Sequence, residues 1–371
     1  MTFPEKTTLR PSMYFVLMIT GLLGFDMLAS PLISAKALGN AGYFAPLAAA
    51  VPAVAAMCAI FALQKRFPGQ SWVQYSIKTI GRIPATIILL LLMITWRFYT
   101  TLLSRDIMSL VSTHMLIKTP TWVFSLMGFL GIIYLAYHGI ESISRFMSFV
   151  FVPASIVVFL VALSAMPYID IRQLLPVFNF SFWDLVKGAF GVSYIYLPIM
   201  LLLVMTPFTR DLRSARRFTS GALALGVLGF ISESLSAIGI FGATGLMRYT
   251  WPTLEFVHIV NVRYLALEQL GVLLLTVWLV LTFGAAAFSY WGASYSLSQL
   301  FPKISYKTAM LILGLPTGLI LLLPRNIIDT RYYLQFLQKW GTMGIYIFPL
   351  TIWLIAVIRG CGKGKKRHTK D

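Results

Sequence analysis

The chain has 371 residues, of which 58% are hydrophobic and only 11% are charged. Soluble globular domains carry about a quarter charged residues, so this composition excludes an ordinary soluble protein. The net charge of +18 suggests a nucleic-acid-binding protein, but basic residues also accumulate in the cytoplasmic loops of membrane proteins. We therefore expect an integral protein of a lipid bilayer, with no nucleic-acid partner.

Apolar blocks long enough to cross a bilayer recur along the whole chain. A helix needs about 20 mostly apolar residues to span the hydrocarbon core. We predict an all-α membrane protein with about ten transmembrane helices in a single polytopic domain, from residue 13 to residue 358. The predicted spans are Met13–Ser34, Tyr43–Leu63, Ile83–Leu103, Trp122–Tyr137, Phe146–Met166, Gly188–Pro207, Phe218–Phe241, Gln269–Trp291, Thr308–Leu323 and Gly344–Ile358.

The distribution of basic residues predicts the orientation of these spans. With the N-terminus inside, 19 of the 30 Lys and Arg residues fall on the inner side and 10 on the outer side. This excess predicts that both termini are cytoplasmic. Residues 1–12 then form a cytoplasmic N-terminus, and residues 359–371 form a basic tail that can contact anionic lipid. The first apolar block is too long for a cleavable signal peptide and is expected to remain as the first span.

Two spans carry helix-breaking residues at matching places in the two halves of the chain. The first span contains Gly21, Gly24 and Pro31, and the sixth contains Gly188, Gly191, Pro198 and Pro207. Irregular backbone is tolerated in a membrane only where protein or a water-filled cavity satisfies its polar groups. Paired broken helices predict a five-plus-five inverted repeat with a ligand site near the membrane midplane. The alternative is that these residues form ordinary kinks.

Three charged residues fall inside predicted spans. Asp26 lies midway through the first span, where a carboxylate requires water or a partner. It is expected to bind a ligand ammonium, a coupling cation or the free N–H groups of a half-helix, or else to pair with Arg97 of the third span. Glu233 lies among serines in the seventh span and is interpreted as a helix–helix hydrogen-bonding residue or as part of a proton relay.

No pattern typical of an enzyme occurs in the sequence. The four histidines are far apart, and the two cysteines, Cys58 and Cys361, form no metal-binding or disulfide framework. No nucleophile elbow or dinucleotide-binding fingerprint is present. We therefore expect no catalytic activity, no cofactor and no metal site.

Several segments, taken in order, resemble one membrane protein family. The first span reaches Pro31 at its outer end, SRDIMSLV follows the third span from Ser104, and GIESISR forms an expected cytoplasmic turn from Gly139. Trp251-Pro252-Thr253 begins a further segment, followed by Glu268. In this order the chain resembles the B subunit of spore germinant receptors, the endospore germination permeases, a branch of the amino acid–polyamine–organocation transporter superfamily.

The resemblance implies a function and a site. Members of the family sense small nutrients, often amino acids, in the spore inner membrane, together with a larger membrane A subunit and a lipoprotein C subunit. The expected function is therefore nutrient sensing by a germination receptor, and the alternative is an active amino acid or amine permease coupled to an ion gradient. The outer loop at Trp251 is implied to act as a lid. The implied ligand-binding residues are Gly24, Phe25, Asp26, Tyr99, Pro198 and Gly284.

The chain departs from the family pattern in the first helix. Many relatives have Gly-x-Gly there, where bare N–H groups bind a carboxylate, whereas this chain has Gly24-Phe25-Asp26. An acid at this point is expected to repel a carboxylate and to attract an amine. The expected ligand class is therefore a small amino acid or amine.

Overall fold

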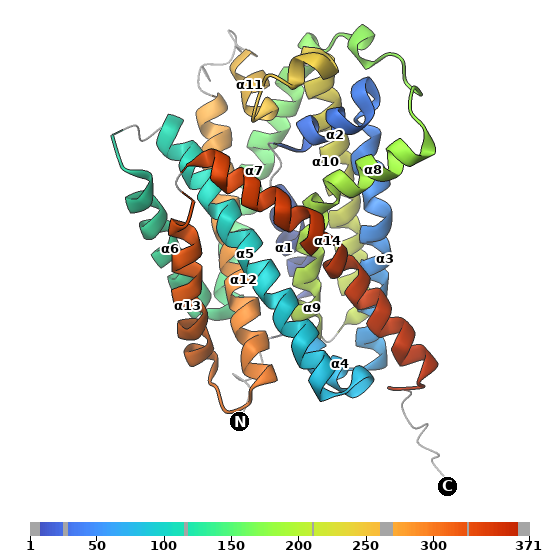
Figure 1. Cartoon of the computed structure of the whole chain (residues 1–371), viewed down its shortest axis with the longest axis vertical. Coiled ribbons are helices and arrows are strands. Elements are labelled where there is room, and N and C mark those ends of the chain that lie inside the picture. The colour runs from blue at the N-terminus through green and yellow to red at the C-terminus, as the bar shows by residue number, and fades with distance from the viewer. Residues whose placement is uncertain are drawn as a thin grey trace.

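The computed structural model describes residues 8–24, 29–114, 118–209, 211–259, 270–324 and 326–362. Within these residues the chain is a bundle of helices without β-strands (Figure 1). Six helical segments are long and apolar enough to cross a membrane, and four shorter apolar helices accompany them. These ten segments coincide with the ten predicted spans, so the predicted all-α membrane fold is confirmed.

The first five spans and their connections occupy the first half of the chain. Two helices, α1 and α2, together make the first span, and the short helix α4 connects the second span to the third. The helices are α1 (Pro11–Gly24), α2 (Ser30–Leu38), α3 (Phe44–Arg66), α4 (Trp72–Ile80), α5 (Arg82–His114), α6 (Thr121–Tyr137) and α7 (Gly139–Ala165), with 3₁₀ turns η2 (Gly39–Ala41), η3 (Met166–Tyr168) and η4 (Ile171–Leu174).

The second half begins with an interrupted span. Here α8 gives way to a 3₁₀ segment, η5, before the α-helix resumes as α9. The elements are α8 (Phe182–Val192), η5 (Ser193–Met200), α9 (Leu201–Met205), η6 (Thr206–Phe208), α10 (Leu212–Leu246), α11 (Pro252–Ile259), α12 (Leu270–Leu300), α13 (Tyr306–Leu322) and α14 (Ile327–Ile358).

Two helices extend well beyond their predicted spans. The third span was predicted to end at Leu103, but α5 continues to His114, and the tenth was predicted to begin at Gly344, but α14 begins at Ile327. Asn326 caps α14, since its side chain accepts a hydrogen bond from the Asp329 N–H at 2.9 Å. Hydropathy missed both extensions because polar side chains are common in them.

The predicted cytoplasmic turn at Gly139–Arg145 is wrong. These residues form the first two turns of α7, which begins directly after α6 ends. Gly139 has a positive φ of 82°, so glycine provides the backbone conformation that the sharp reversal requires. Glu141 and Arg145 form an exposed ion pair with an N–O distance of 2.6 Å along the helix.

The interrupted spans lie at the centre of the bundle. α1 packs against α7, α10, α12 and η5. The most apolar part of Phe182–Phe208 is 83% buried inside the protein, whereas the most apolar part of Gly139–Tyr168 is only 22% buried. The sixth span is therefore internal, and α7 presents apolar side chains such as Phe149 outward. Such an exterior suits contact with lipid.

The two ends of the bundle carry different segments (Figure 1). We call them the α4 end, with α4 and the turn from α12 to α13, and the α11 end, with α2 and α11. At the α4 end, the Arg359 guanidinium donates a hydrogen bond to the Thr79 carbonyl at 2.9 Å. The Leu9 N–H donates to the Phe208 carbonyl at 2.9 Å, and the Phe208 ring contacts Tyr295 of α12 with centroids 5.5 Å apart.

Close packing at Gly42 gives a test of the fold. A Cβ atom there would lie 2.8 Å from the Ser34 carbonyl carbon and 2.9 Å from Cδ1 of Ile238. Because backbone atoms cannot move aside, Gly42→Ala is expected to lower the free energy of unfolding by about 1–3 kcal/mol. Thermal unfolding of the purified protein in detergent measures the effect.

The matched control is Gly229→Ala in α10. No heavy atom lies within 4 Å of a Cβ atom built at Gly229. Alanine is a better helix former than glycine, so this variant is expected to melt at the wild-type temperature or slightly above it. Equal melting temperatures for the two variants would contradict the close contact at Gly42.

Candidate functional site

The interruption of the first span is docked on the middle of α12. α1 ends at Gly24, whose carbonyl oxygen accepts a hydrogen bond from the Thr282 hydroxyl at 2.8 Å. A Cβ atom on Gly24 would lie 3.0 Å from the carbonyl carbon of Leu281. Glycine thus allows the last described residue of α1 to approach the α12 backbone, and Thr282 donates a hydrogen bond to its carbonyl.

The interruption of the sixth span is fully enclosed by protein. All eight residues of η5 are buried. The Ser193 carbonyl accepts a hydrogen bond from the Tyr346 hydroxyl of α14 at 2.5 Å, and the Tyr196 hydroxyl donates to the Pro46 carbonyl of α3 at 2.9 Å. The irregular backbone is therefore held from two sides by neighbouring helices.

The ligand-binding residues that the resemblance implied lie on several helices. Pro198 faces α1, because a Cβ atom on Gly21 would lie 3.2 Å from its Cβ. Tyr99 is buried in α5, which packs against α12. Gly284 of α12 faces α7 instead, where a Cβ atom would lie 3.2 Å from the Phe146 ring. Whether these residues bind a ligand stays a prediction.

Phe25 and Asp26 lie outside the described residues. The predicted roles of Asp26, including its pairing with Arg97, therefore stay predictions. Arg97 itself is 4% exposed in the middle of α5. Its Nη1 donates to the hydroxyls of Thr100 at 3.3 Å and Ser289 at 3.5 Å.

Glu233 of α10 connects three elements near the α11 end. Its carboxylate accepts hydrogen bonds from the Ser30 hydroxyl at 3.1 Å and from the Thr253 hydroxyl at 2.5 Å. Ser30 begins α2, the second half of the first span, and a helix N-terminus favours a nearby negative charge. These contacts agree with the helix–helix interpretation of Glu233; a proton relay through it stays a prediction.

A buried ion pair at the α11 end was missed by the sequence analysis. Asp106 of α5 is 0% exposed, and its Oδ2 lies 2.7 Å from Nη2 of Arg331 in α14. The Arg331 guanidinium carbon lies 5.3 Å from the centroid of the Trp251 ring, just before α11. The Arg105-Asp106 dipeptide next to an apolar block was the available signal, but residue 331 becomes its neighbour only through the fold.

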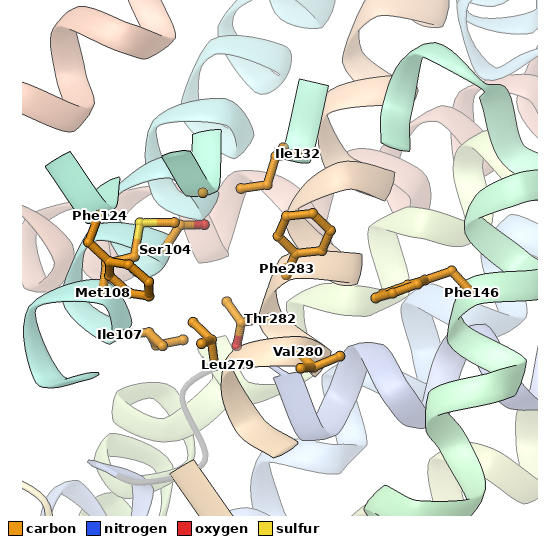
Figure 2. A pocket seen from close by; sticks show the side chains of 11 residues that line it. Ser104, Ile107, Met108, Phe124, Ile132, Phe146, Leu279, Val280, Thr282 and Phe283 are labelled. Carbon is orange, nitrogen blue, oxygen red and sulfur yellow. The ribbon is translucent and has the colours of Figure 1, made fainter. Parts of the chain in front are cut away.

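An apolar cavity of about 330 Å³ lies between α5, α6, α7 and α12 (Figure 2). Figure 2 shows Ser104, Met108 and Phe124 on one side and Phe283 and Phe146 on the other. The surface of the cavity is apolar, and the residues that line it are Ser104, Ile107, Met108, Phe124, Gly128, Ile132, Phe146, Leu279, Val280, Thr282 and Phe283.

The cavity adjoins the interruption of the first span. Thr282, which lines it, is also the residue whose hydroxyl binds the Gly24 carbonyl. The Phe146 and Phe283 rings meet edge to face with centroids 5.8 Å apart and close the side toward α7. The cavity therefore suits the apolar part of a small molecule.

Solved structures of transporters share this fold. The crystal structure of MhsT in complex with L-phenylalanine matches with a TM-score of 0.72 at 11% identity, over 96% of this chain and 91% of that one. The structure of Mhp1, a nucleobase-cation-symport-1 family transporter, in a closed conformation with bromovinylhydantoin bound matches with a TM-score of 0.61 at 13% identity, over 89% and 77%. These likenesses show that the chain shares the fold of these transporters.

Sequence relatives give the family. The spore germination protein GerQB of Bacillus cereus is 22% identical over 360 residues, 95% of this chain and 96% of the relative. The spore germination protein YndE of Bacillus subtilis is 22% identical over 304 residues, 81% and 83% of the two chains. A family model described as "Spore germination protein" matches residues 8–330. The chain therefore belongs to the spore germination protein family of permease-like membrane proteins.

Proposed function

We propose that the chain is the nutrient-sensing, permease-like subunit of a spore germination receptor. It binds a small amino acid or amine near the membrane midplane, next to the interrupted helices. The observation that carries this proposal is the combination of family membership over residues 8–330 with the fold of a transporter solved with a bound amino acid.

The geometry at the interruption supports binding of a small molecule. The cavity of about 330 Å³ falls in the range of ligand sites, roughly 300–1,000 Å³. Two similar folds were solved with small organic molecules, L-phenylalanine and bromovinylhydantoin. Thr282 lines the cavity and its hydroxyl binds the Gly24 carbonyl, so a molecule in the cavity would lie near the last described residue of α1.

The location and partners follow from the proposed role. Relatives named as spore germination proteins support a place in the spore inner membrane with germination receptor A and C subunits. The α4 end, which holds Lys65, Arg66 and Arg359, faces the cytoplasm in this proposal because basic residues favour that side.

The segment Trp251–Ile259 acts as the lid in this proposal. It is attached at two points, through Thr253 to Glu233 of α10 and through Trp251 to Arg331 of α14. Arg331 is itself fixed by Asp106. Opening of the α11 end would therefore require the lid to break its contacts with α10 and α14.

Deletion of the gene is expected to abolish germination in response to one small nutrient while other nutrients still act. Expression of the wild-type chain in the deletion strain should restore the response, measured as loss of optical density of purified spores. The alternative role, an active permease, is tested by uptake of the same labelled nutrient into proteoliposomes. Rapid ion-dependent uptake would indicate such a permease. Unchanged germination with every nutrient tested would contradict the proposed function.

Cys361 provides a label for the cytoplasmic orientation of the C-terminal end. In a Cys58→Ala background, an impermeant maleimide added to intact cells is expected to leave Cys361 unmodified, because the membrane separates them. Labelling should appear after permeabilisation. The control is Lys118→Cys, at an exposed position between α5 and α6, which should react in intact cells. Reaction of Cys361 in intact cells would reverse the proposed topology.

The Asp106–Arg331 pair is expected to stabilise the closed α11 end. Asp106→Asn leaves Arg331 without its counter-charge, and breaking a buried pair costs about 3–5 kcal/mol. The melting temperature of the purified variant should fall clearly, and Asp106→Asn with Arg331→Gln should recover much of the loss.

The control for this pair is Glu141→Gln. It breaks the Glu141–Arg145 pair, whose side chains are 52% and 75% exposed, and exposed pairs contribute about 0–1 kcal/mol. Its melting temperature should stay near that of the wild type. A double variant at Asp106 and Arg331 that melts below both single variants would argue against the ion pair as the stabilising contact.

A further inference from the structure

Arg97 is a buried cation whose partners, within the described part of the chain, are neutral. Its guanidinium donates to hydroxyl oxygens of Thr100, Ser289 and Thr317 at 3.3–3.5 Å and lies over the Tyr290 ring at 4.5 Å. Its Nε has no hydrogen-bond partner. No described carboxylate forms an ion pair with it. A buried charge needs a counter-charge or good hydrogen bonds, so this site is suited to an anion.

The guanidinium is connected to the apolar cavity along one face of α5. Arg97, Thr101, Ser104 and Met108 follow at spacings of four, three and four residues and therefore share a face. They line a second, small cavity of about 10 Å³, and Ser104 and Met108 also line the large one. From Arg97 to Ser104 the helix rises about 10 Å, and the bond to Thr100 directs the guanidinium toward the cavity.

Met108 lines both cavities, together with Ser104 and Ile132. A Cβ atom built on Gly128 of α6 would overlap the methyl group of Met108, so glycine leaves room for the methionine there. The small cavity has space for about one water molecule, and a larger group needs Met108 to turn away. Methionine is unbranched and flexible, which suits it to this movement.

We propose that Arg97 binds the carboxylate of a small apolar ligand whose body occupies the cavity between α5, α6, α7 and α12. The inference rests on the proposed function and specifies its ligand class. A guanidinium binds a carboxylate through two parallel hydrogen bonds, and the hydroxyls that now contact Arg97 remain as further donors. The apolar lining with Phe146 and Phe283 excludes a second charged group from the body of the ligand. An ammonium group next to the carboxylate is compatible with this site, so apolar amino acids belong to the class.

Binding to the purified protein in lipid nanodiscs tests the proposal. The probes are L-leucine, L-phenylalanine and 4-methylpentanoate, each beside its amide, which keeps the shape and removes the negative charge. At least one carboxylate is expected to bind the wild type, with its amide weaker by roughly ten- to a hundredfold, since a charge-assisted hydrogen bond is lost. Arg97→Gln should remove this preference, and Arg97→Lys should restore only part of it.

Two variants make the result specific. Arg105→Gln changes an equally buried arginine of α5, which contacts Ser125 at 2.7 Å and lines neither cavity, so it should keep the carboxylate preference. Gly128→Ala adds a methyl group to the lining of the large cavity and displaces the Met108 methyl group, so it should weaken carboxylate binding while Arg97 is intact. Without ligand, Arg97→Gln should melt at or above the wild-type temperature, because it removes a buried charge that no described carboxylate compensates.

The outcomes separate this inference from the proposed function. Equal binding of acids and amides, or a carboxylate preference that survives Arg97→Gln, overturns the role of Arg97 and leaves nutrient sensing intact. A strong fall in melting temperature for Arg97→Gln without ligand identifies an internal counter-charge and also overturns it. If no carboxylate binds while spores still respond through this chain, the ligand class is wrong; if germination does not depend on the chain either, both fail.

Discussion

The structure depends on how the backbone groups released by two interrupted helices are satisfied inside a membrane. No water is available in the hydrocarbon core, so each freed carbonyl or amide needs a protein partner. The Gly24 carbonyl receives the Thr282 hydroxyl, and the Ser193 carbonyl receives the Tyr346 hydroxyl. These bonds place α12 against the first span and α14 against the sixth. The longer helices surround this centre, and α7 turns its apolar side chains outward.

The same constraint decides where charged side chains lie. Asp106 and Arg331 are 225 residues apart in the sequence and satisfy each other at the α11 end. Glu233 uses two hydroxyls instead, from the start of α2 and from α11. Both clusters attach the segment around Trp251 to the bundle, so the position of this segment at the α11 end depends on the contacts of buried charged groups.

The cavity and the end of α1 have a residue of α12 in common. Thr282 lines the cavity and binds the Gly24 carbonyl of α1, while Gly284, two residues further along α12, lies against Phe146, which also lines the cavity. A change in the cavity therefore acts on residues that position α1 and α7.

The sequence by itself determined the membrane class, the ten apolar segments and the two interruptions, because the length of apolar runs and the positions of Gly and Pro are local properties. It also indicated Gly24 as an interruption residue and Arg97 as a charge inside a span. Hydropathy missed the extension of α5 to His114 and the start of α14 at Ile327. Polar side chains in these extensions are satisfied by partners far away in the sequence, which local hydropathy cannot detect. Only the tertiary structure decided that Asp106 meets Arg331, that Gly284 faces α7, and that Ser104, Met108 and Thr282 line one cavity. Those relations arise from packing between helices far apart in the chain, and each requires the complete bundle.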